Sequence, residues 1–536
     1  MTLNTIFTIM GIMIAAIALL PTIRRQELML KVRTIDWIVI IFTILLVHYA
    51  IFFSFFKFWG FSPGLNLHNY GITPSNLSYF IIICSGIFLL IRIKSYQLKS
   101  SNLISFKSLI SQLLARRMYT ELSLILERNI KSIFVIANLD FPMGKHHTKF
   151  KKILDDKSFH ELYMADQSGD DLNKLSKFKR NIYKTWLIIT PDYSRRATEA
   201  SDLLKSIMLK REVTEYLAIN SPYLGMSLLQ NKDYYSNSYI NDYFKTLIHD
   251  KNSILYFELK NNQNTNEYSY EIEVDNLLLS YLFNPGMNAK KLGVWAPIGE
   301  YIETHLANLG KSTSDRHLKQ NKDYYEDGKW DSSLFVGISF FDIMIKSALK
   351  QNVKWHMWLY FYNFFGERII KNLKNFTNEE DDHYEWASPY HYLLYIIVSN
   401  LCDYIKAIEL ISIDQENVKL DSIDIKHENG SIVKSSILCL MMIIRKILIS
   451  KHIADLYKLY LINIPFNVLF TLQKNDELER YFHCLRNAII EGGFSNGIKD
   501  QEYWTELLKC AKKIDFIKYD IDEVNKFILD IKNRIE

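Results

Sequence analysis

A mainly α-helical chain with three N-terminal membrane spans is the fold class that the sequence predicts. Three apolar runs with almost no charge occupy the first part of the 536 residues, and apolar residues recur at helical spacing through most of the rest. The five cysteines are odd in number, widely spaced and never in a CxxC pair. This pattern argues against both a disulfide framework and a structural zinc site.

The three apolar runs predict spans over about residues 3–23, 37–56 and 77–93. The first run is uncharged and has the length of one bilayer crossing, about 20 residues. Its basic residues follow the run instead of preceding it, which favours a retained anchor over a cleaved signal peptide. The second run is uncharged apart from His48. The third is shorter, and its flanking residues extend it.

Lysine and arginine residues flank these runs unevenly. The connection after the first run and the segment after the third are basic, whereas the connection between the second and third runs has only Lys57. Because cytoplasmic loops carry the Lys/Arg excess, we expect a multi-pass protein of the cell (inner or plasma) membrane. Its N-terminus would lie outside, and the domain after about residue 95 would be cytoplasmic. The residues that predict this orientation are Arg24, Arg25, Lys31, Arg33, Arg92 and Lys94.

Two features inside the predicted spans could have a function. Gly11, Ala15 and Ala18 recur at i, i+4 and i+7, and small residues at this spacing allow helices to approach closely. They would pack either against the other spans of the same chain or against a second copy. His48 is ionisable, and such residues within a membrane often mark functional sites. A neutral, hydrogen-bonded imidazole is the simpler interpretation, because the spans contain no charged partner for it.

Helical periodicity dominates the chain after the predicted spans. Two short β-rich runs, “IFVIA” (133–137) and “WLIIT” (186–190), indicate a small α/β element over about 130–190. “NSILYFELKN” and “EYSYEIEV” predict a β-hairpin near 253–274. The predicted regions are a membrane region (1–95), a helical region with the α/β element (96–250), a hairpin with helices (251–377) and a C-terminal helical region (386–536).

A basic cluster in “GKHHTKFKK” (144–152) is the candidate anion-binding site. It follows the predicted strand at 133–137, as a phosphate loop would, but it lacks the early glycine and the Ser/Thr after lysine of a Walker loop. The alternative is a solvated helix face balanced by Asp155 and Asp156. The candidate residues are Lys145, His146, His147, Lys149, Lys151 and Lys152.

Four other motifs fail as catalytic or ligand sites. “GFSNG” around Ser495 follows a predicted helix, and no histidine comes after it, so it does not fit a nucleophile elbow. “HELYM” has Met164 where a zinc protease needs its second histidine. “NEEDDHYEW” (378–386) has no spacing for a hard cation and fits a solvated linker. “KWHMWLYFYNFF” (354–365) fits a buried aromatic helix. We therefore expect no catalytic residues, metal or cofactor.

Three functional hypotheses follow. The first is a membrane-anchored protein whose helical domain serves interaction or sensing, with the bilayer and a protein partner or second copy as its partners. The second is an oligomerising membrane effector that forms a pore or perturbs the bilayer, as in a bacterial defence or stress response. The third is a phosphate- or nucleotide-handling enzyme that uses Lys145–Lys152. A net charge of only +5 argues against a dedicated nucleic-acid binder.

Overall fold

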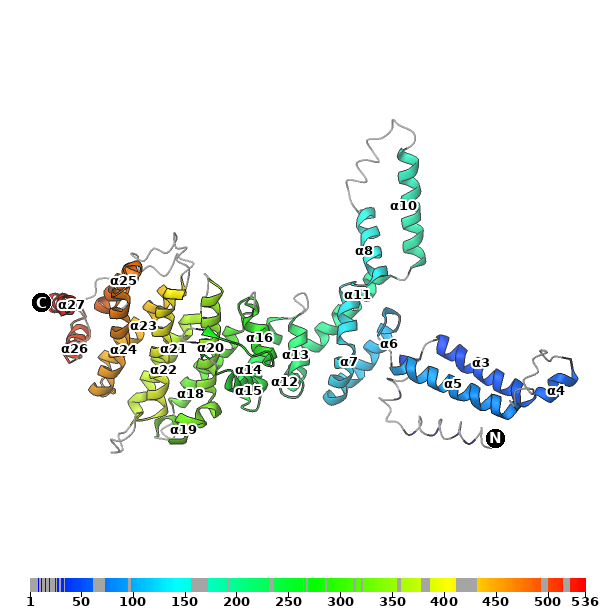
Figure 1. Cartoon of the computed structure of the whole chain (residues 1–536), viewed down its shortest axis with the longest axis horizontal. Coiled ribbons are helices and arrows are strands. Elements are labelled where there is room, and N and C mark those ends of the chain that lie inside the picture. The colour runs from blue at the N-terminus through cyan, green and yellow to red at the C-terminus, as the bar shows by residue number, and fades with distance from the viewer. Residues whose placement is uncertain are drawn as a thin grey trace. The chain divides into compact units, whose positions relative to one another are not determined.

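The computed structural model describes most of the chain after residue 33. Before it, only scattered positions are described; the described ranges are 34–60, 73–94, 98–155, 172–190, 192–230, 236–263, 265–266, 269–284, 287–311, 315–319, 322–353, 358–376, 386–410, 431–492, 500–513 and 521–536. The chain divides into two compact units, Met1–Met208 and Leu209–Glu536. Both are almost entirely helical, which confirms the mainly α prediction (Figure 1).

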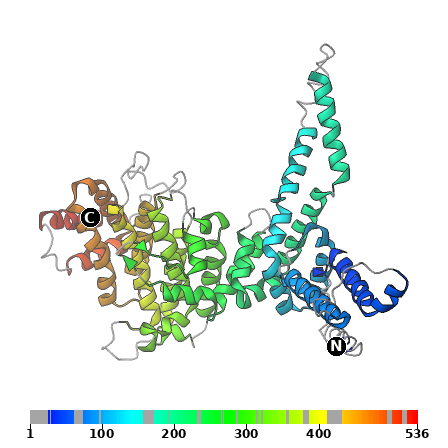
Figure 2. The same ribbon diagram turned by 45° about the vertical axis from the view of Figure 1, so that its right-hand side comes forward.

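The first unit contains two helical groups. In one, α3 packs along α5, and α4 follows α3 directly. In the other, α6, α7 and α11 pack together, and α8 pairs with α10 as a hairpin that Figures 1 and 2 show side by side. The bounds are α3 (Thr34–Ile51), α4 (Phe53–Phe58), α5 (Pro74–Lys94), η2 (Ser100–Asn102), α6 (Leu103–Ala115), α7 (Tyr119–Ala137), α8 (Pro142–Asp155), α10 (Leu172–Ile189) and α11 (Tyr193–Met208).

The structure contradicts the prediction of three membrane spans. Within the described residues, no helix combines the length and the apolarity that a bilayer crossing requires. The uncharged run 37–56 is divided between two helices, because α3 ends at Ile51 and α4 begins at Phe53. The run 77–91 has only fifteen residues before Arg92. The predicted span 3–23 lies mostly outside the described residues.

The multi-pass membrane localisation and its orientation depended on those spans, so these predictions are corrected with them. Polar contacts link the two helices that were expected to cross the bilayer. The Arg92 guanidinium lies 3.1 Å from the Asp36 carboxylate, and the hydroxyls of Thr43 and Ser85 are 2.7 Å apart. The outer side of α3 is nevertheless apolar: Trp37 remains 52% exposed.

The second unit is an array of stacked helices in two layers (Figure 1). Consecutive members of the first layer contact one another in the order α12, α14, α18, α21, α23, α26. Members of the second layer do so in the order α13, α16, α20, α22, α24, α25. The helices of the first layer are α12 (Arg211–Asn220), α14 (Asn237–His249), α18 (Trp295–Leu309), α21 (Trp358–Asn372), α23 (Ile432–Ile449) and α26 (Gln501–Ala511).

The second layer and the shorter elements complete this unit. They are α13 (Pro222–Leu229), α15 (Ile254–Asn261), β1 (Thr265–Asn266), β2 (Ser269–Tyr270), α16 (Leu277–Phe283), α17 (Asn288–Leu292), η3 (Arg316–Leu318), α19 (Lys322–Glu326), η4 (Gly328–Asp331), α20 (Ser333–Lys350), η5 (Leu373–Asn375), α22 (Pro389–Lys406), η6 (Ala407–Leu410), α24 (Asp455–Gln473), η7 (Asp476–Leu478), α25 (Glu479–Glu491) and α27 (Ile521–Ile535). α27 packs on α26.

Most of the predicted β structure is helical. “IFVIA” belongs to α7, where Ile130, Ile133 and Ile136 recur at helical spacing and are buried. “WLIIT” lies at the end of α10. In the predicted hairpin, residues 254–261 form α15, and among its described residues the β structure is the antiparallel pair of two-residue strands β1 and β2. From α15 the Glu258 carboxylate accepts the backbone N–H groups of Leu278 and Leu279 at the start of α16, at 3.1 and 2.9 Å.

Glycines allow close helix crossings within the array. A Cβ atom at Gly299 on α18 would lie 2.5 Å from the ring of Phe361 on α21, so only glycine fits this crossing. The helix predicted before “GFSNG” is α25, and Gly492 directly after it takes a left-handed conformation with φ of 63°, which commonly ends a helix.

Ion pairs join neighbouring helices of the first layer. Each is at least partly exposed, so each contributes at most about 1 kcal/mol to stability and mainly fixes the register between helices. The pairs are Lys245–Glu300 (3.1 Å), Glu303–Arg368 (3.9 Å), Glu367–Lys446 (2.6 Å) and Arg445–Asp500 (2.5 Å).

Candidate functional site

The predicted anion-binding residues all lie on α8. Lys145, Lys149 and Lys152 are spaced at i, i+4 and i+7 and therefore share one face of the helix. All three are exposed, and Lys145 pairs with Asp140 at 2.6 Å. Lys151 is also exposed. The element before this cluster is helix α7 and not a strand, so the strand-to-loop context of a phosphate-binding loop is missing.

The two histidines of the cluster differ. His146 is exposed, with its ring centroid 6.0 Å from that of Phe150. His147 is only 5% exposed, packs near Trp186 and Tyr193, and its Nδ1 has no hydrogen-bond partner within the described part of the chain. Burial lowers the pKa of His147 below its ordinary value. His147 is therefore part of the packed interior and is not a surface anion ligand.

The residues predicted to act within membrane spans have ordinary local contacts. His48 Nδ1 lies 2.9 Å from the carbonyl oxygen of Ile44, one turn earlier on α3. Gly11 and Ala15 are helical and exposed, whereas Ala18 lies outside the described residues. Of the predicted orientation residues, Lys31 pairs with Glu27 at 3.0 Å and Arg92 with Asp36. Arg25 is half-buried, Lys94 ends α5, and Arg24 and Arg33 lie outside the described residues.

The weak motifs mostly fall outside the described residues as well. Ser495, “HELYM” and residues 378–385 are among them. The aromatic stretch is described from Trp358 onward, as α21. Its buried rings, including Tyr362 and Phe365, agree with a core helix, while Tyr360 is 48% exposed.

A buried polar network that includes aspartate, histidine and serine joins η3, α20 and α22. His317 Nδ1 lies 3.0 Å from Asp315 Oδ1, and His317 Nε2 lies 3.2 Å from Ser332 Oγ. The Tyr390 hydroxyl donates to the other oxygen of Asp315, and Asn372 donates to the Tyr390 oxygen at 3.1 Å. Burial alone would raise the pKa of Asp315, but the hydrogen bonds from His317 and Tyr390 outweigh it and hold the pKa below its ordinary value.

In this network an aspartate contacts a histidine and the histidine contacts a serine, as in a hydrolase triad. Unlike the residues of a triad, these residues are not accessible to a substrate. A nucleophilic serine must meet the substrate carbonyl, with donors placed for the developing oxyanion. Asp315, His317 and Ser332 are 3%, 1% and 2% exposed, so their atoms are closed to a substrate. Asp315 also accepts the backbone N–H of His317 at the start of η3. The arrangement therefore stabilises the packing of these elements, and sequence inspection missed it because no motif connects the residues.

A second buried network contains the ion pair of Asp342 and Lys346, one turn apart on α20. The Asp342 carboxylate also accepts the hydroxyls of Tyr270, at 2.5 Å, and Tyr404, at 2.8 Å. Both oxygens of this carboxylate thus accept hydrogen bonds, as a buried charge requires. Burial raises the pKa of the nearby Asp403.

The buried cysteines are poor nucleophiles. Burial raises the pKa of the thiols of Cys402 and Cys439 above their ordinary value, which disfavours the reactive thiolate. The described residues also include no group of three or more His, Cys, Asp or Glu side chains placed to hold a metal ion.

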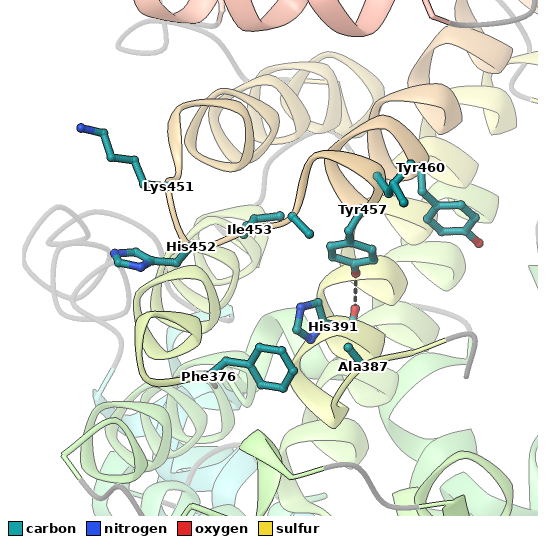
Figure 3. Close-up of a pocket in the computed structure, with 10 residues that line it drawn as sticks. Phe376, Ala387, His391, Lys451, His452, Ile453, Tyr457 and Tyr460 are labelled. Atoms are coloured by element: carbon teal, nitrogen blue, oxygen red, sulfur yellow. Dashed lines mark hydrogen bonds between the residues drawn. The ribbon is translucent and has the colours of Figure 1, made fainter. Parts of the chain in front are cut away.

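An open pocket of about 510 Å³ lies where the α23–α24 turn meets the start of α22. Figure 3 shows Lys451 and His452 of this turn on one side and Tyr457 and Tyr460 of α24 on the other. Leu456, at the rim, is 81% exposed. The lining residues are Phe376, Ala387, His391, Lys451, His452, Ile453, Ala454, Leu456, Tyr457 and Tyr460.

Aromatic rings form much of the inner wall of this pocket. Burial lowers the pKa of His391 to about 4, so its ring is neutral at physiological pH. The ring is held by the Ser388 hydroxyl, 2.8 Å from Nδ1, and by Phe376, whose ring centroid is 5.0 Å away. The Tyr457 hydroxyl donates to the His391 carbonyl oxygen (Figure 3). Among the described lining residues none has a carboxylate, and Lys451 is the only lysine or arginine.

Comparison with known proteins identified no matching protein-family model, no matching curated protein and no matching solved structure. The functional argument therefore depends on the geometry of the chain itself.

Proposed function

We propose that this chain is a scaffold that binds a segment of a partner protein at the pocket between the α23–α24 turn and α22. The observation that carries the proposal is the pocket itself, where the rings of Phe376, His391 and Tyr457 adjoin an exposed leucine and a lysine. Stacked helix pairs often present extended binding surfaces, which is an analogy of architecture and supports a binding role only generally.

Binding is favoured over catalysis because the polar network that resembles a triad and the buried cysteines are closed to substrates. The aspartate–histidine–serine network is buried, and burial disfavours the thiolates of Cys402 and Cys439. In contrast, Leu456 and Tyr460 are 81% and 43% exposed beside an open pocket. Exposed apolar and aromatic side chains next to a preformed pocket are typical anchors of protein interfaces.

The chemistry of the pocket defines the partner segment. An aliphatic or aromatic side chain would fit against Phe376, His391 and Tyr457, because these rings form the apolar wall. Lys451 is at the rim, and its side chain, which extends outward in Figure 3, supplies the positive charge for a carboxylate beside that anchor. The proposed occupant is therefore a peptide segment with an apolar anchor next to Asp or Glu.

Selection from a displayed random-peptide library on the full-length chain tests this proposal. We expect enriched peptides to share an apolar anchor next to an acidic residue. Leu456→Asp should weaken their binding by roughly tenfold, equivalent to about 1.4 kcal/mol. Tyr360→Ala is the control, because Tyr360 is an exposed residue on α21 that is not among the residues lining the pocket.

A charge reversal sharpens the test. Lys451→Glu should shift the selected peptides from acidic to basic residues beside the anchor, without loss of the anchor. If no common anchor is enriched, or if Leu456→Asp and Tyr360→Ala change binding equally, the pocket is not the binding site.

A further inference from the structure

The positive charge of the chain is concentrated in the α8–α10 hairpin. α8 has four lysines against one aspartate, and α10 has four lysines and one arginine against no acid, so the two helices carry +8 together. The whole chain carries only +5. Residues 156–171 between them lie outside the described part and are acidic in sequence, with five Asp/Glu against one Lys. The cations are therefore specific to the paired helices.

Aromatic packing joins the two helices and orients α8. The ring of Phe150 stacks on Tyr183 with centroids 4.3 Å apart, and it meets Trp186 edge-on at 5.0 Å. Lys145, Lys149 and Lys152 lie on the opposite side of α8, because they are about half a turn away from Phe150 and His147. Lys149 and Lys152 make no ion pair with any residue of the described part.

We propose that this basic hairpin binds the phosphate backbone of a nucleic-acid duplex. The lysine stripe follows the helix axis over roughly 10 Å, at 1.5 Å per residue, so it can meet several phosphates of one strand. The inference is independent of the partner-protein pocket on the second unit.

The side chains around the stripe favour a duplex over other polyanions. An anionic membrane would be bound by an amphipathic helix with an exposed apolar face. On α8 the ring of Phe150 is turned toward α10, whereas Ile188 and Ile189 at the end of α10 are exposed, so vesicle binding is the competing outcome that the experiment measures. Single strands are usually bound by exposed aromatic platforms, whereas the described rings of Phe150, Tyr183 and Trp186 are packed against each other. Binding would therefore be electrostatic and without sequence preference.

Fluorescence anisotropy with the full-length chain and a short labelled DNA duplex of mixed sequence tests the inference. The affinity should fall steeply between about 50 and 200 mM salt. Lys149→Ala with Lys152→Ala should reduce the salt slope by about 2 and the affinity at about 0.1 M salt by roughly 60-fold, because each lost phosphate contact releases about 0.9 fewer counterions. An RNA duplex should behave similarly, since the contacts are to phosphates.

Lys371→Ala with Lys374→Ala is the matched control. These two lysines have the same i, i+3 spacing and are also exposed, but they lie at the end of α21 and in η5. The control should keep both the affinity and the salt slope. The inference is overturned if the full-length chain binds no duplex at low salt, or if both double variants change binding equally. It is also overturned if vesicles of phosphatidylserine and phosphatidylcholine bind more tightly than the duplex and lose binding in the α8 variant.

Discussion

Replacing Asp315 with asparagine separates a structural from a catalytic role for the buried network. The carboxylate accepts three hydrogen bonds, from the His317 backbone, from His317 Nδ1 and from the Tyr390 hydroxyl. Asparagine retains one acceptor oxygen, but its amide group would place an N–H donor against one of the groups that donate to the Asp315 carboxylate. Each hydrogen bond to a charged group contributes about 1.5–3 kcal/mol, and relief of charge burial offsets part of the loss. We expect Asp315→Asn to lower the free energy of unfolding by about 3 kcal/mol.

Ser332→Ala provides the comparison within the same network. It removes one neutral hydrogen bond, at 3.2 Å from His317, so it should lower the free energy of unfolding by only about 1 kcal/mol. Urea unfolding followed by tryptophan fluorescence measures both changes, because Trp330 is buried two residues before Ser332. The difference in the free energy of unfolding between the parent and Asp315→Asn should become smaller below about pH 4. The folded pKa of Asp315 is lowered, so its stabilisation is present above the unfolded pKa and is lost as pH falls through the folded pKa.

A catalytic role would give a different result. Ser332 would then be labelled by a fluorophosphonate probe, and Asp315→Asn would prevent the labelling with little change in stability. That combination would refute the structural interpretation. Absence of labelling together with the graded loss of stability is the expected outcome.

Three further predictions concern the array. Lys346→Met should lower the free energy of unfolding by about 3–5 kcal/mol, because it leaves Asp342 charged and buried without its partner. In a double-mutant cycle measured by urea unfolding, adding Asp342→Asn should recover more than half of that loss. Gly299→Ala should lower the urea midpoint of unfolding, because the clash with Phe361 costs about 1–3 kcal/mol and exceeds the gain in helix propensity. An unchanged or higher midpoint would contradict the close contact between α18 and α21. The pKa of His391 is about 4 in the folded state and 6.5 in the unfolded state, so protonation favours unfolding as the pH falls between these values. From pH 7 to about pH 4.5, the free energy of unfolding of the parent should fall by about 2 kcal/mol more than that of His391→Gln. Equal losses would show that the ring is accessible to protons.

The helical nature of the chain could be predicted from the sequence because burial follows the 3.6-residue period. Ile130, Ile133 and Ile136 of α7 show it clearly, although “IFVIA” taken alone resembles a strand. Five apolar residues are too few to distinguish the 3.6-residue period of a helix from the two-residue period of a strand. The longer pattern around them is needed to tell the two apart. The membrane prediction failed for a related reason, since the uncharged run 37–56 was counted without the helix end at Ile51.

Candidate sites were predictable only where neighbours in sequence create them. The lysine stripe of α8 is visible in the sequence, but its pairing with basic α10 depends on the contact between Phe150 and Tyr183. The buried network connects Asp315 to Tyr390, 75 positions later, and such long-range contacts leave no local motif. The pocket beside Leu456 likewise requires α22 and the α23–α24 turn to meet.

Photo-crosslinking in the cells that produce this chain tests the binding function most directly. A benzoylphenylalanine at position 456, beside the pocket, should give a discrete crosslinked protein, and tandem mass spectrometry should place the crosslink beside an apolar residue of that protein. The same group at position 360, on the exposed side of α21, should not give this product. Identical crosslinked products at both positions, or none at position 456, would contradict a scaffold that binds its partner through this pocket.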